Sequence, residues 1–339
     1  MSSPSFQTAF VTGATGFIGE RLCLALAEAG VEVRALVRTP AKAETIAQAG
    51  VTTISGDVMS PATYVEALRG VEVVFHLAGV LKAPWRESFA RTNGHGPRVV
   101  AEACAAVSPS PALVVVSSLA AAGPVQSGTP RNELMPLEPI SIYGRAKLAG
   151  EQGLEEYSQR LSMAVLRPPM VFGAGDQAAL GLFRLADRGL GVLPTWRENR
   201  LSLVHVDDVV GAMMAMGDGA RRRESGPIDA YFIGADEQPT FSELAHRIAR
   251  ACGHEGARVL RLPRGLTFLA AFFSHWVARV LDRPAILNLD KYREAVAGDW
   301  TCDPGKLTRD LGWRPAHSLD ERLLETVRGY RENGLLKKR

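Results

Sequence analysis

Two side chains that could exchange a proton, Tyr143 and Lys147, stand four residues apart. On a helix this spacing places both side chains on one face and within reach of each other. A phenol with a pKa near ~10 is a poor acid or base at neutral pH, and a neighbouring ammonium stabilises its phenolate form. The pair therefore predicts an acid–base site. The same spacing also occurs by chance in many helices, where it is purely structural.

A glycine-rich turn from Thr12 to Gly19 could bind a dinucleotide, because it follows a short apolar run and opens a helical pattern. Gly13 permits the tight turn, Gly16 lets the backbone approach a pyrophosphate, and Gly19 allows close packing of helix and strand. The helix N-terminus then offers N–H groups and a partial positive charge to the phosphates. This context favours nicotinamide dinucleotide binding over plain turn chemistry.

The end of the second expected strand indicates which dinucleotide binds. NAD enzymes usually place an acidic residue there for the ribose 2′-hydroxyl, whereas this chain has Arg38, followed by Lys42. A guanidinium can pair with a 2′-phosphate, so the sequence favours NADP, with NAD left open. The alternative for Arg38 is a solvent-facing side chain at a strand end. Asp57 is placed to accept a hydrogen bond from the adenine amino group, or is an ordinary turn aspartate.

Short β-rich runs alternate with helical patterns through the first half of the chain. The expected strands are 9–11, 31–37, 51–54, 71–76 and 113–116, and the expected helices are 19–29, 40–48, 61–69 and 97–106. This alternation predicts βαβ units and a parallel sheet. The fold class is therefore α/β: a Rossmann doubly wound parallel sheet with a smaller, mostly C-terminal substrate-binding lobe. We expect residues 1–168, with 203–235, to form the NAD(P)-binding domain, and 169–202 plus 236–339 to form the substrate-binding lobe.

Composition and charge disfavour several classes of protein. The 339 residues include 39 basic and 36 acidic side chains, which leave a net charge of +3, so we expect no nucleic acid partner. The four cysteines are far apart and form no C-x-x-C pair, which favours a reducing cytoplasm. Residues 1–8 lack a signal-peptide pattern, and the apolar stretch 266–281 is shorter than the ~20 residues that a membrane-spanning helix needs. We expect a soluble cytoplasmic protein, with peripheral membrane contact left open.

The chain resembles the extended short-chain dehydrogenase/reductase family, which contains nucleotide-sugar epimerases and dehydratases, dihydroflavonol reductases and 3β-hydroxysteroid dehydrogenases. The resemblance covers almost the whole chain, and its motifs occur in the family's order. They are Thr12–Gly19, Gly56-Asp57, Phe75–Gly79, Asn93, Val116-Ser117-Ser118, Tyr143 with Lys147, Leu166–Gly173, Val204–Asp208 and Leu311–Pro315.

The resemblance implies a role for each matching residue. Tyr143 is the general acid in carbonyl reduction, and Lys147 holds the nicotinamide ribose hydroxyls and lowers the pKa of the tyrosine. Ser118 hydrogen-bonds the substrate oxygen, with Ser117 as the neighbouring candidate. The cofactor-binding residues are expected to be Thr12, Gly13, Thr15, Gly16, Phe17, Ile18, Gly19, Arg38, Asp57, Val58, Leu77, Ala78, Gly79, Asn93, Tyr143, Lys147 and Pro168. The family often dimerises through a bundle that includes the Tyr143–Lys147 helix, so we expect a homodimer.

Three further polar positions have simpler interpretations. Asn93 could order the backbone near the site instead of binding cofactor, and His76, in a buried strand, is expected to be a satisfied polar residue. His205 with Asp207 and Asp208 could suggest a metal site, but the resemblance implies a structural segment, so no metal is expected.

Departures from the family's patterns narrow the substrate class. Dehydratase members carry an acidic pair after the serine, whereas Ser118 is followed by Leu119-Ala120, which disfavours sugar dehydration. The stretch 267–277 is more apolar than a sugar-nucleotide lobe requires. An apolar or polycyclic substrate, a membrane or partner contact, or simply a buried helix would account for it.

These observations predict an NADP-dependent oxidoreductase that transfers a hydride between nicotinamide and an alcohol or ketone substrate. The alternatives are a nucleotide-sugar epimerase and a non-catalytic NADP-binding regulatory protein. Relatives of the second kind typically lose the tyrosine or the lysine, and this chain retains both.

Overall fold

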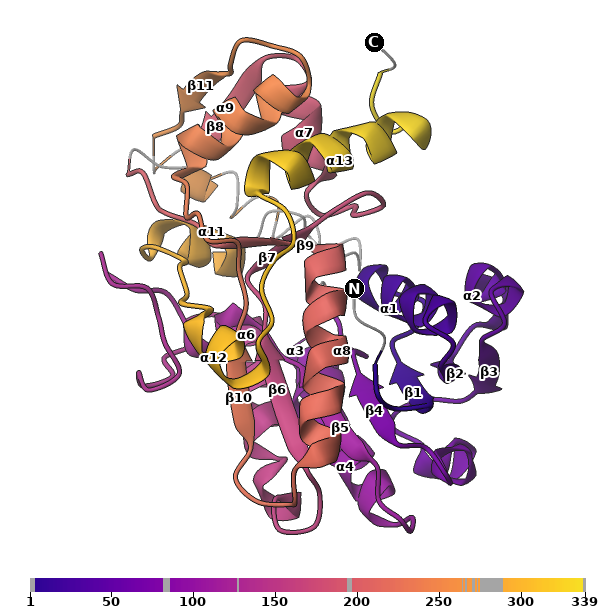
Figure 1. The fold of residues 1–339 in the computed structure, drawn as a ribbon. Coiled ribbons are helices and arrows are strands. Elements are labelled where there is room, and N and C mark those ends of the chain that lie inside the picture. Colours follow the sequence, from indigo (N-terminus) through magenta and orange to yellow (C-terminus); the bar gives the residue numbers. More distant parts are fainter. Residues whose placement is uncertain are drawn as a thin grey trace.

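The computed structural model describes residues 4–81, 86–126, 128–193, 197–263, 265, 267–269, 272, 274 and 289–337. A seven-stranded sheet lies at the centre of the molecule, in the order β10-β6-β5-β4-β1-β2-β3, and all neighbouring strands in it are parallel (Figure 1). Its strands are β1 (Thr8–Thr12), β2 (Glu32–Val37), β3 (Thr52–Ser55), β4 (Val73–His76), β5 (Ala112–Val116), β6 (Met163–Arg167) and β10 (Asp229–Phe232). The predicted Rossmann fold is confirmed.

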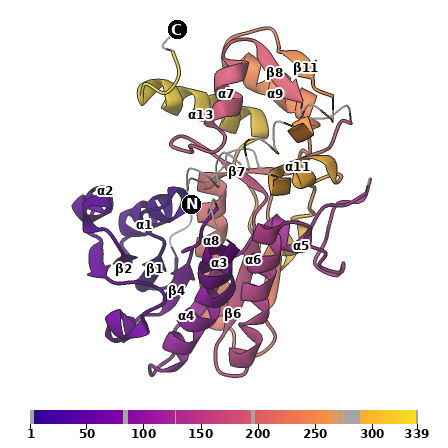
Figure 2. The ribbon, with the colours of Figure 1, turned by 180° about the vertical axis from the view of Figure 1, so that it is seen from behind.

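Helices cover both faces of this sheet, which is why its central strands are apolar except at their carboxyl ends, where β4 has His76 and β6 has Arg167. β4, β5 and β6 are buried along their whole length. On one face lie α1 (Phe17–Glu28), α2 (Glu44–Gln48) and α8 (Val206–Arg222), packed into one apolar core. On the other face lie α4 (Gly96–Ala105) and α6 (Ile142–Gln152), which Figure 2 shows in front of the sheet.

A smaller lobe follows the sheet and has a core of its own. Two short parallel pairs lie outside the large sheet, β7 (Met170–Phe172) with β9 (Leu203–His205), and β8 (Leu190–Leu193) with β11 (Arg258–Arg261). The helices of the lobe are α7 (Leu180–Ala186), α9 (Phe241–Ala251), α11 (Leu289–Val296) and α13 (Leu319–Glu332), while α12 (Gly305–Leu311) contacts β10. Thr240 and Ser318 close capping boxes that fix where α9 and α13 begin.

The helix expected at 61–69 is not a single helix. Two 3₁₀ turns, η2 (Pro61–Thr63) and η3 (Val65–Leu68), stand in its place, because Tyr64 between them has a φ of −141°. The Tyr64 hydroxyl donates to the Val58 carbonyl at 3.0 Å, which ties the segment to the loop after β3. The helix expected at 40–48 is likewise divided, into η1 (Pro40–Lys42) and α2. None of the helices in the described ranges combines the length and the apolar character needed to cross a bilayer.

Candidate active site

The glycine turn between β1 and α1 brings three backbone segments together. Gly13 has a φ of +72°, and a Cβ there would lie 2.6 Å from the backbone nitrogen of Ala78, in the segment that follows β4. A Cβ on Gly19 would collide with the Gly13 carbonyl. Only glycine fits at these two positions, and the result is a shallow cradle at the carboxyl ends of β1 and β4.

The N-terminus of α1 points at this cradle with its first N–H groups. Gly16 precedes the helix and donates to the Gly13 carbonyl at 3.0 Å, and no side chain caps the helix. Phe17 and Ile18 therefore begin the helix at the position where a Rossmann turn receives a pyrophosphate. Thr15, at the tip of the turn, is exposed. The cradle thus fits the phosphates of a dinucleotide.

Arg38 and Asp57 lie at the sheet edge formed by β2 and β3, where the adenosine half of a cofactor would extend. Arg38 directly follows β2, is exposed and carries no ion pair with any described residue. Asp57 Oδ1 accepts a hydrogen bond from the Met59 backbone at 2.8 Å, as an ordinary turn aspartate does. Val58 beside it is buried.

Helix α6 carries Tyr143 and Lys147 and packs unusually close to its neighbours. A Cβ on Gly144 would collide with the Ala120 carbonyl of α5 (Leu119–Ala122), and one on Gly150 would collide with the Asn93 carbonyl of η4 (Ala90–His95). Ser141 caps the helix by accepting from the Gly144 backbone at 3.0 Å. The glycines therefore bring the α6 side chains next to the segments after β4 and β5.

Tyr143 lies between α5, α11 and Phe89 of α3 (Arg86–Phe89). Its ring meets that of Phe89 edge-on, at 6.3 Å between centroids. Burial raises the pKa of Tyr143 to about 12; a hydrogen bond with Ser118 opposes this, and the Glu294 carboxylate of α11 adds to it. The phenol is therefore protonated at neutral pH. Lys147 is not among the groups that shift its pKa, so the lowering of the Tyr143 pKa by Lys147 that the resemblance implies is not found in this structure.

Lys147 is anchored to the end of β5. Its ammonium donates to the Val116 carbonyl at 2.9 Å. Burial lowers the pKa of Lys147 to about 8, and the carboxylate of Glu151, one helical turn further along α6, acts in the opposite direction. Gly79 lies against this group, since a Cβ there would be 3.3 Å from Lys147 Nζ.

The two serines after β5 face different surroundings. Ser118 caps α5 by accepting from the Ala120 backbone at 3.1 Å, and it is the serine that meets Tyr143. Ser117 is buried and donates a short hydrogen bond to Glu151. The structure thus brings together Ser118, Tyr143 and Lys147 and directs Ser117 away from them.

The remaining predicted residues order the loops around this centre. Buried Asn93 hydrogen-bonds the backbone of Val80, next to Gly79. His76 Nδ1 pairs with Thr12 Oγ1 at 2.7 Å, while its Nε2 is buried without a partner among the described residues, so His76 is only half satisfied. Pro168 accepts at its carbonyl from the Leu119 backbone at 2.8 Å and so joins the ends of β5 and β6.

Sequence reasoning missed the carboxylates that surround this centre. Glu151 is buried against Ser117 and Arg167, and Glu294 of α11 influences Tyr143. Helical spacing of four from Lys147 could have revealed Glu151. Glu294 had no such signal, because only tertiary structure brings α11 to α6, where Asp290 accepts from the Ile142 backbone at 2.8 Å.

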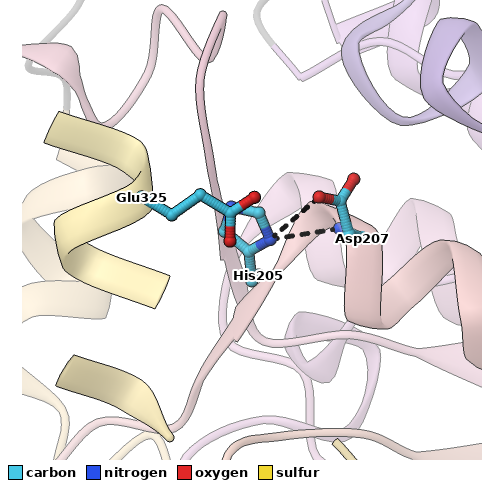
Figure 3. A group of neighbouring side chains, drawn as sticks. All are labelled: His205, Asp207 and Glu325. Carbon is cyan, nitrogen blue, oxygen red and sulfur yellow. Dashed lines mark hydrogen bonds and ion pairs between the residues drawn. The ribbon is translucent and has the colours of Figure 1, made fainter. Parts of the chain in front are cut away.

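His205, Asp207 and Glu325 form a compact group where α8 meets α13. Their ligand atoms lie within 4.8 Å of one another, and Figure 3 shows the Glu325 side chain reaching toward the His205 ring. Both carboxylates are already paired: Asp207 with Arg21 at 2.9 Å and Glu325 with Arg322 at 2.7 Å. Two guanidiniums at these oxygens oppose a metal cation, so we interpret the group as an ion-pair junction of α1, α8 and α13.

The apolar stretch expected at 266–281 lies largely outside the described residues. Within it, Phe268 stacks on Phe272 at 6.3 Å and meets Tyr292 of α11 at 5.5 Å. Phe268, Leu269 and Phe272 are exposed. An aromatic surface therefore adjoins α11, the helix that also borders Tyr143.

Comparison with known proteins agrees with this geometry. Residues 9–234 match the sequence model of the NAD dependent epimerase/dehydratase family. A ceramide reductase of Caulobacter vibrioides is 32% identical over 330 residues, which cover 97% of this chain and 96% of that protein. A 2-alkyl-3-oxoalkanoate reductase of Shewanella oneidensis is 28% identical over 335 residues, covering 92% of this chain and 84% of that protein. The crystal structure of a UDP-glucose 4-epimerase from Thermotoga maritima has a similar fold, with a TM-score of 0.74, 24% identity, and coverage of 96% of this chain and 99% of that one. The chain therefore belongs to the NAD-dependent epimerase/dehydratase family of extended short-chain dehydrogenases/reductases, and it is an NAD(P)-dependent enzyme of the oxidoreductase or epimerase type.

Proposed function

We propose that this enzyme is an NADP-dependent reductase of ketones, working reversibly on the corresponding alcohols, with Ser118, Tyr143 and Lys147 as its catalytic residues. The observation that carries the proposal is the convergence of three side chains: Tyr143 hydrogen-bonds Ser118, and Lys147, one helical turn along α6, is anchored to the Val116 carbonyl just before the two serines. A protonated phenol next to a hydroxyl is suited to a carbonyl oxygen that gains negative charge during reduction.

Each residue has one task in this reaction. The bound nicotinamide supplies the hydride. Ser118 Oγ donates a hydrogen bond to the substrate carbonyl oxygen, and Tyr143 Oη donates the proton that completes the alcohol. Lys147 binds the nicotinamide ribose hydroxyls, and its positive charge stabilises the phenolate that Tyr143 leaves behind.

The cofactor-binding residues are proposed to extend along the carboxyl edge of the sheet. The glycine cradle and the start of α1 hold the pyrophosphate, while Arg38 pairs with the 2′-phosphate of NADP. Asp57 and Val58 border the adenine, and the segment from Leu77 to Gly79 borders the nicotinamide half. The Arg38 guanidinium, which is exposed and has no ion pair within the part of the chain that the structure describes, supports NADP over NAD.

The proposed substrate is a ketone that carries long or bulky apolar groups. Two relatives matched over most of their length bear the names ceramide reductase, which refers to a lipid with long apolar chains, and 2-alkyl-3-oxoalkanoate reductase, which refers to a ketone with an alkyl group. The exposed aromatic rings of Phe268 and Phe272 provide an apolar surface beside α11, the helix whose Glu294 acts on Tyr143. Leu119-Ala120, in place of an acidic pair, disfavours dehydration of a sugar.

The test is a substrate screen with purified full-length protein. NADPH and NADH are each mixed with long-chain 3-oxo lipids, sterol ketones, flavonoids and nucleotide sugars, and both nicotinamide absorbance and product identity are followed. Oxidation of NADPH by an apolar ketone is expected. Interconversion of a nucleotide sugar without net change in nicotinamide absorbance would show an epimerase instead, and failure to bind either cofactor would refute the proposal.

We also propose the organisation in which this site works. The sheet with its return through 203–235 forms the cofactor domain, and 169–202 with 236–339 forms the substrate lobe. Two copies pair through α4 and α6, whose shared outer face has a hollow of about 510 Å³ lined by Gly94, Arg98 and Ala149 among others. Light scattering should give a dimer, and Ala149→Arg should yield monomers.

We also propose a cytoplasmic location. The four cysteines are free and buried, as is usual for a protein in a reducing compartment.

A further inference from the structure

Glu151 stands at the meeting point of three elements that build the active site. It lies on α6, one turn after Lys147. Its Oε1 accepts a hydrogen bond from Ser117 Oγ, just beyond β5. Its Oε2 accepts from Arg167 Nη2 at 2.7 Å, at the end of β6, and Arg167 Nε approaches both oxygens at 3.2 Å. One carboxylate therefore ties α6 to two adjacent strand ends.

Lys147 and Glu151 each contact one of two consecutive residues at the end of β5. Lys147 binds the Val116 carbonyl at 2.9 Å, and Glu151 binds the side chain of the next residue, Ser117. Two consecutive residues of one strand end are thus held by two consecutive turns of one helix. Ser118 comes directly after them, so its position relative to α6 depends on both contacts.

The Glu151 group is dry and charged. Ser117, Glu151 and Arg167 are 4%, 8% and 6% exposed. The Arg167 guanidinium also lies 5.5 Å from the centre of the Phe232 ring of β10. A buried ion pair generally gives little net stability compared with apolar packing, so its presence calls for another explanation.

We propose that Glu151 is a positioning residue for the reaction, which sets the placement of Ser118 against Tyr143 and Lys147 and keeps Lys147 in its cationic form. The proposal rests on the catalytic assignment made above. Glu151 itself touches neither substrate nor cofactor and acts through Ser118 and Lys147, which do.

The electrostatic part follows from the groups that face the Lys147 ammonium. Glu151 acts on it from α6, His76 from β4, and uncharged Asn93 lies beside it on η4. Burial lowers the pKa of His76 to about 3, so this imidazole is neutral, and Tyr143 is protonated. Glu151 supplies the negative charge that opposes the loss of the Lys147 proton on burial.

The experiment compares three variants of the full-length enzyme over pH 6–10. Glu151→Gln keeps the shape of the side chain and removes its charge. Ser117→Ala keeps the charge of Glu151 and removes its contact with the end of β5. Glu155→Gln is the matched control, on an exposed glutamate four residues further along the chain. In Glu151→Gln the pKa of Lys147 should fall by about one unit, so that much less of the lysine is protonated at pH 8.5. The ratio of kcat at pH 6.5 to kcat at pH 8.5 should therefore rise roughly sixfold. Ser117→Ala should lower kcat at every pH and leave that ratio unchanged, and Glu155→Gln should match the wild type.

A second measurement needs no substrate and therefore separates this proposal from the proposed function. Competitive labelling with acetic anhydride, read by mass spectrometry, follows the titration of Lys147 directly. In Glu151→Gln, Lys147 should become reactive at lower pH than in the wild type. An unchanged Lys147 titration, or a kcat ratio equal to that of Glu155→Gln, would overturn the proposal.

The substitution leaves Arg167 without its carboxylate and could prevent folding. Combining Glu151→Gln with Arg167→Gln removes that buried cation, and the double variant carries the same predictions for the kcat ratio and for labelling. If the double variant folds and titrates like the wild type, the proposal fails.

Discussion

Asn93 holds both backbone groups of Val80: its Oδ1 accepts from the Val80 N–H at 2.8 Å, and its Nδ2 donates to the Val80 carbonyl at 2.9 Å. Asn93 is 1% exposed and belongs to the π-helical turn η4, which packs against α6. A side chain from the helical layer thus completes the backbone hydrogen bonds of the loop after β4. This loop contains Gly79, which contacts both Asn93 and Lys147.

Asn93→Ala should therefore weaken both stability and cofactor binding. Two backbone groups lose their partners in a half-buried setting, which costs about 1–3 kcal/mol of unfolding free energy. NADPH affinity should fall about tenfold, because the Gly79–Val80 loop is no longer fixed. Urea denaturation and fluorescence titration measure the two effects, with Asn132→Ala, which loses one backbone contact outside the site, as control. Lost stability with unchanged affinity would contradict the proposed role of the loop.

Tyr143→Phe should lower kcat for ketone reduction by roughly 10²–10⁴-fold, because the proton donor is lost while the ring remains. The Kd for NADPH should stay within about threefold of the wild type, since the residues that hold the phosphates are untouched. Steady-state kinetics and equilibrium titration distinguish the two quantities. Tyr157→Phe, a tyrosine on η5 (Glu155–Tyr157), is the matched control and should keep full kcat. Undiminished turnover in Tyr143→Phe would identify another proton donor.

Arg38→Ala should raise the Kd for NADPH by about tenfold or more, through loss of a charge-assisted contact to the 2′-phosphate. The Kd for NADH should change little, because NADH lacks that phosphate. Titration of both cofactors against the exposed-arginine control Arg188→Ala measures the difference. Equal effects on NADPH and NADH would show that Arg38 is only a solvent-facing side chain.

Gly19→Ala should be far more damaging than Gly30→Ala. The added methyl group at position 19 collides with the Gly13 carbonyl, which distorts the phosphate cradle and costs about 1–3 kcal/mol or more. At position 30 the methyl group meets nothing within 4 Å, and only the strain of a φ of +83° remains, about 1–2 kcal/mol. Cofactor binding should be lost in the first variant and retained in the second. Cofactor affinity that is equal in both would contradict the assignment of the cradle.

Stability should fall as the pH drops below about 6.5, in part because of His76. Burial lowers the folded-state pKa of His76 to about 3, so between about pH 6.5 and pH 3 the unfolded chain binds a proton that the folded chain does not. This contributes about 1.6 kcal/mol of lost stability between pH 6.5 and pH 5. In His76→Gln that contribution should vanish, while His205, whose pKa burial also lowers, still contributes. Urea denaturation at the two pH values provides the comparison, and an identical pH dependence in His76→Gln would contradict it.

The sequence alone determined the framework and the location of the chemistry. Gly13, Gly16 and Gly19 follow an apolar run and open a helical pattern, which is the context of a Rossmann turn, and the all-apolar run of β5 indicates burial on both faces of a sheet. Tyr143 and Lys147 are separated by one helical turn, so local geometry is enough to pair them. These features depend on contacts between near neighbours in the chain, which the order of residues records directly.

Tertiary structure decided which neighbours give these residues their properties. The sequence preferred Ser118 over Ser117 only through a family resemblance. The structure separates them, because Ser117 is buried against Glu151 while Ser118 meets Tyr143. Glu294 reaches Tyr143 only because α11 folds back over α6. The pKa values of Tyr143 and Lys147 follow from burial between segments far apart in the chain. Desolvation and charge pairing depend on distances in space, and no local pattern in the sequence encodes those distances.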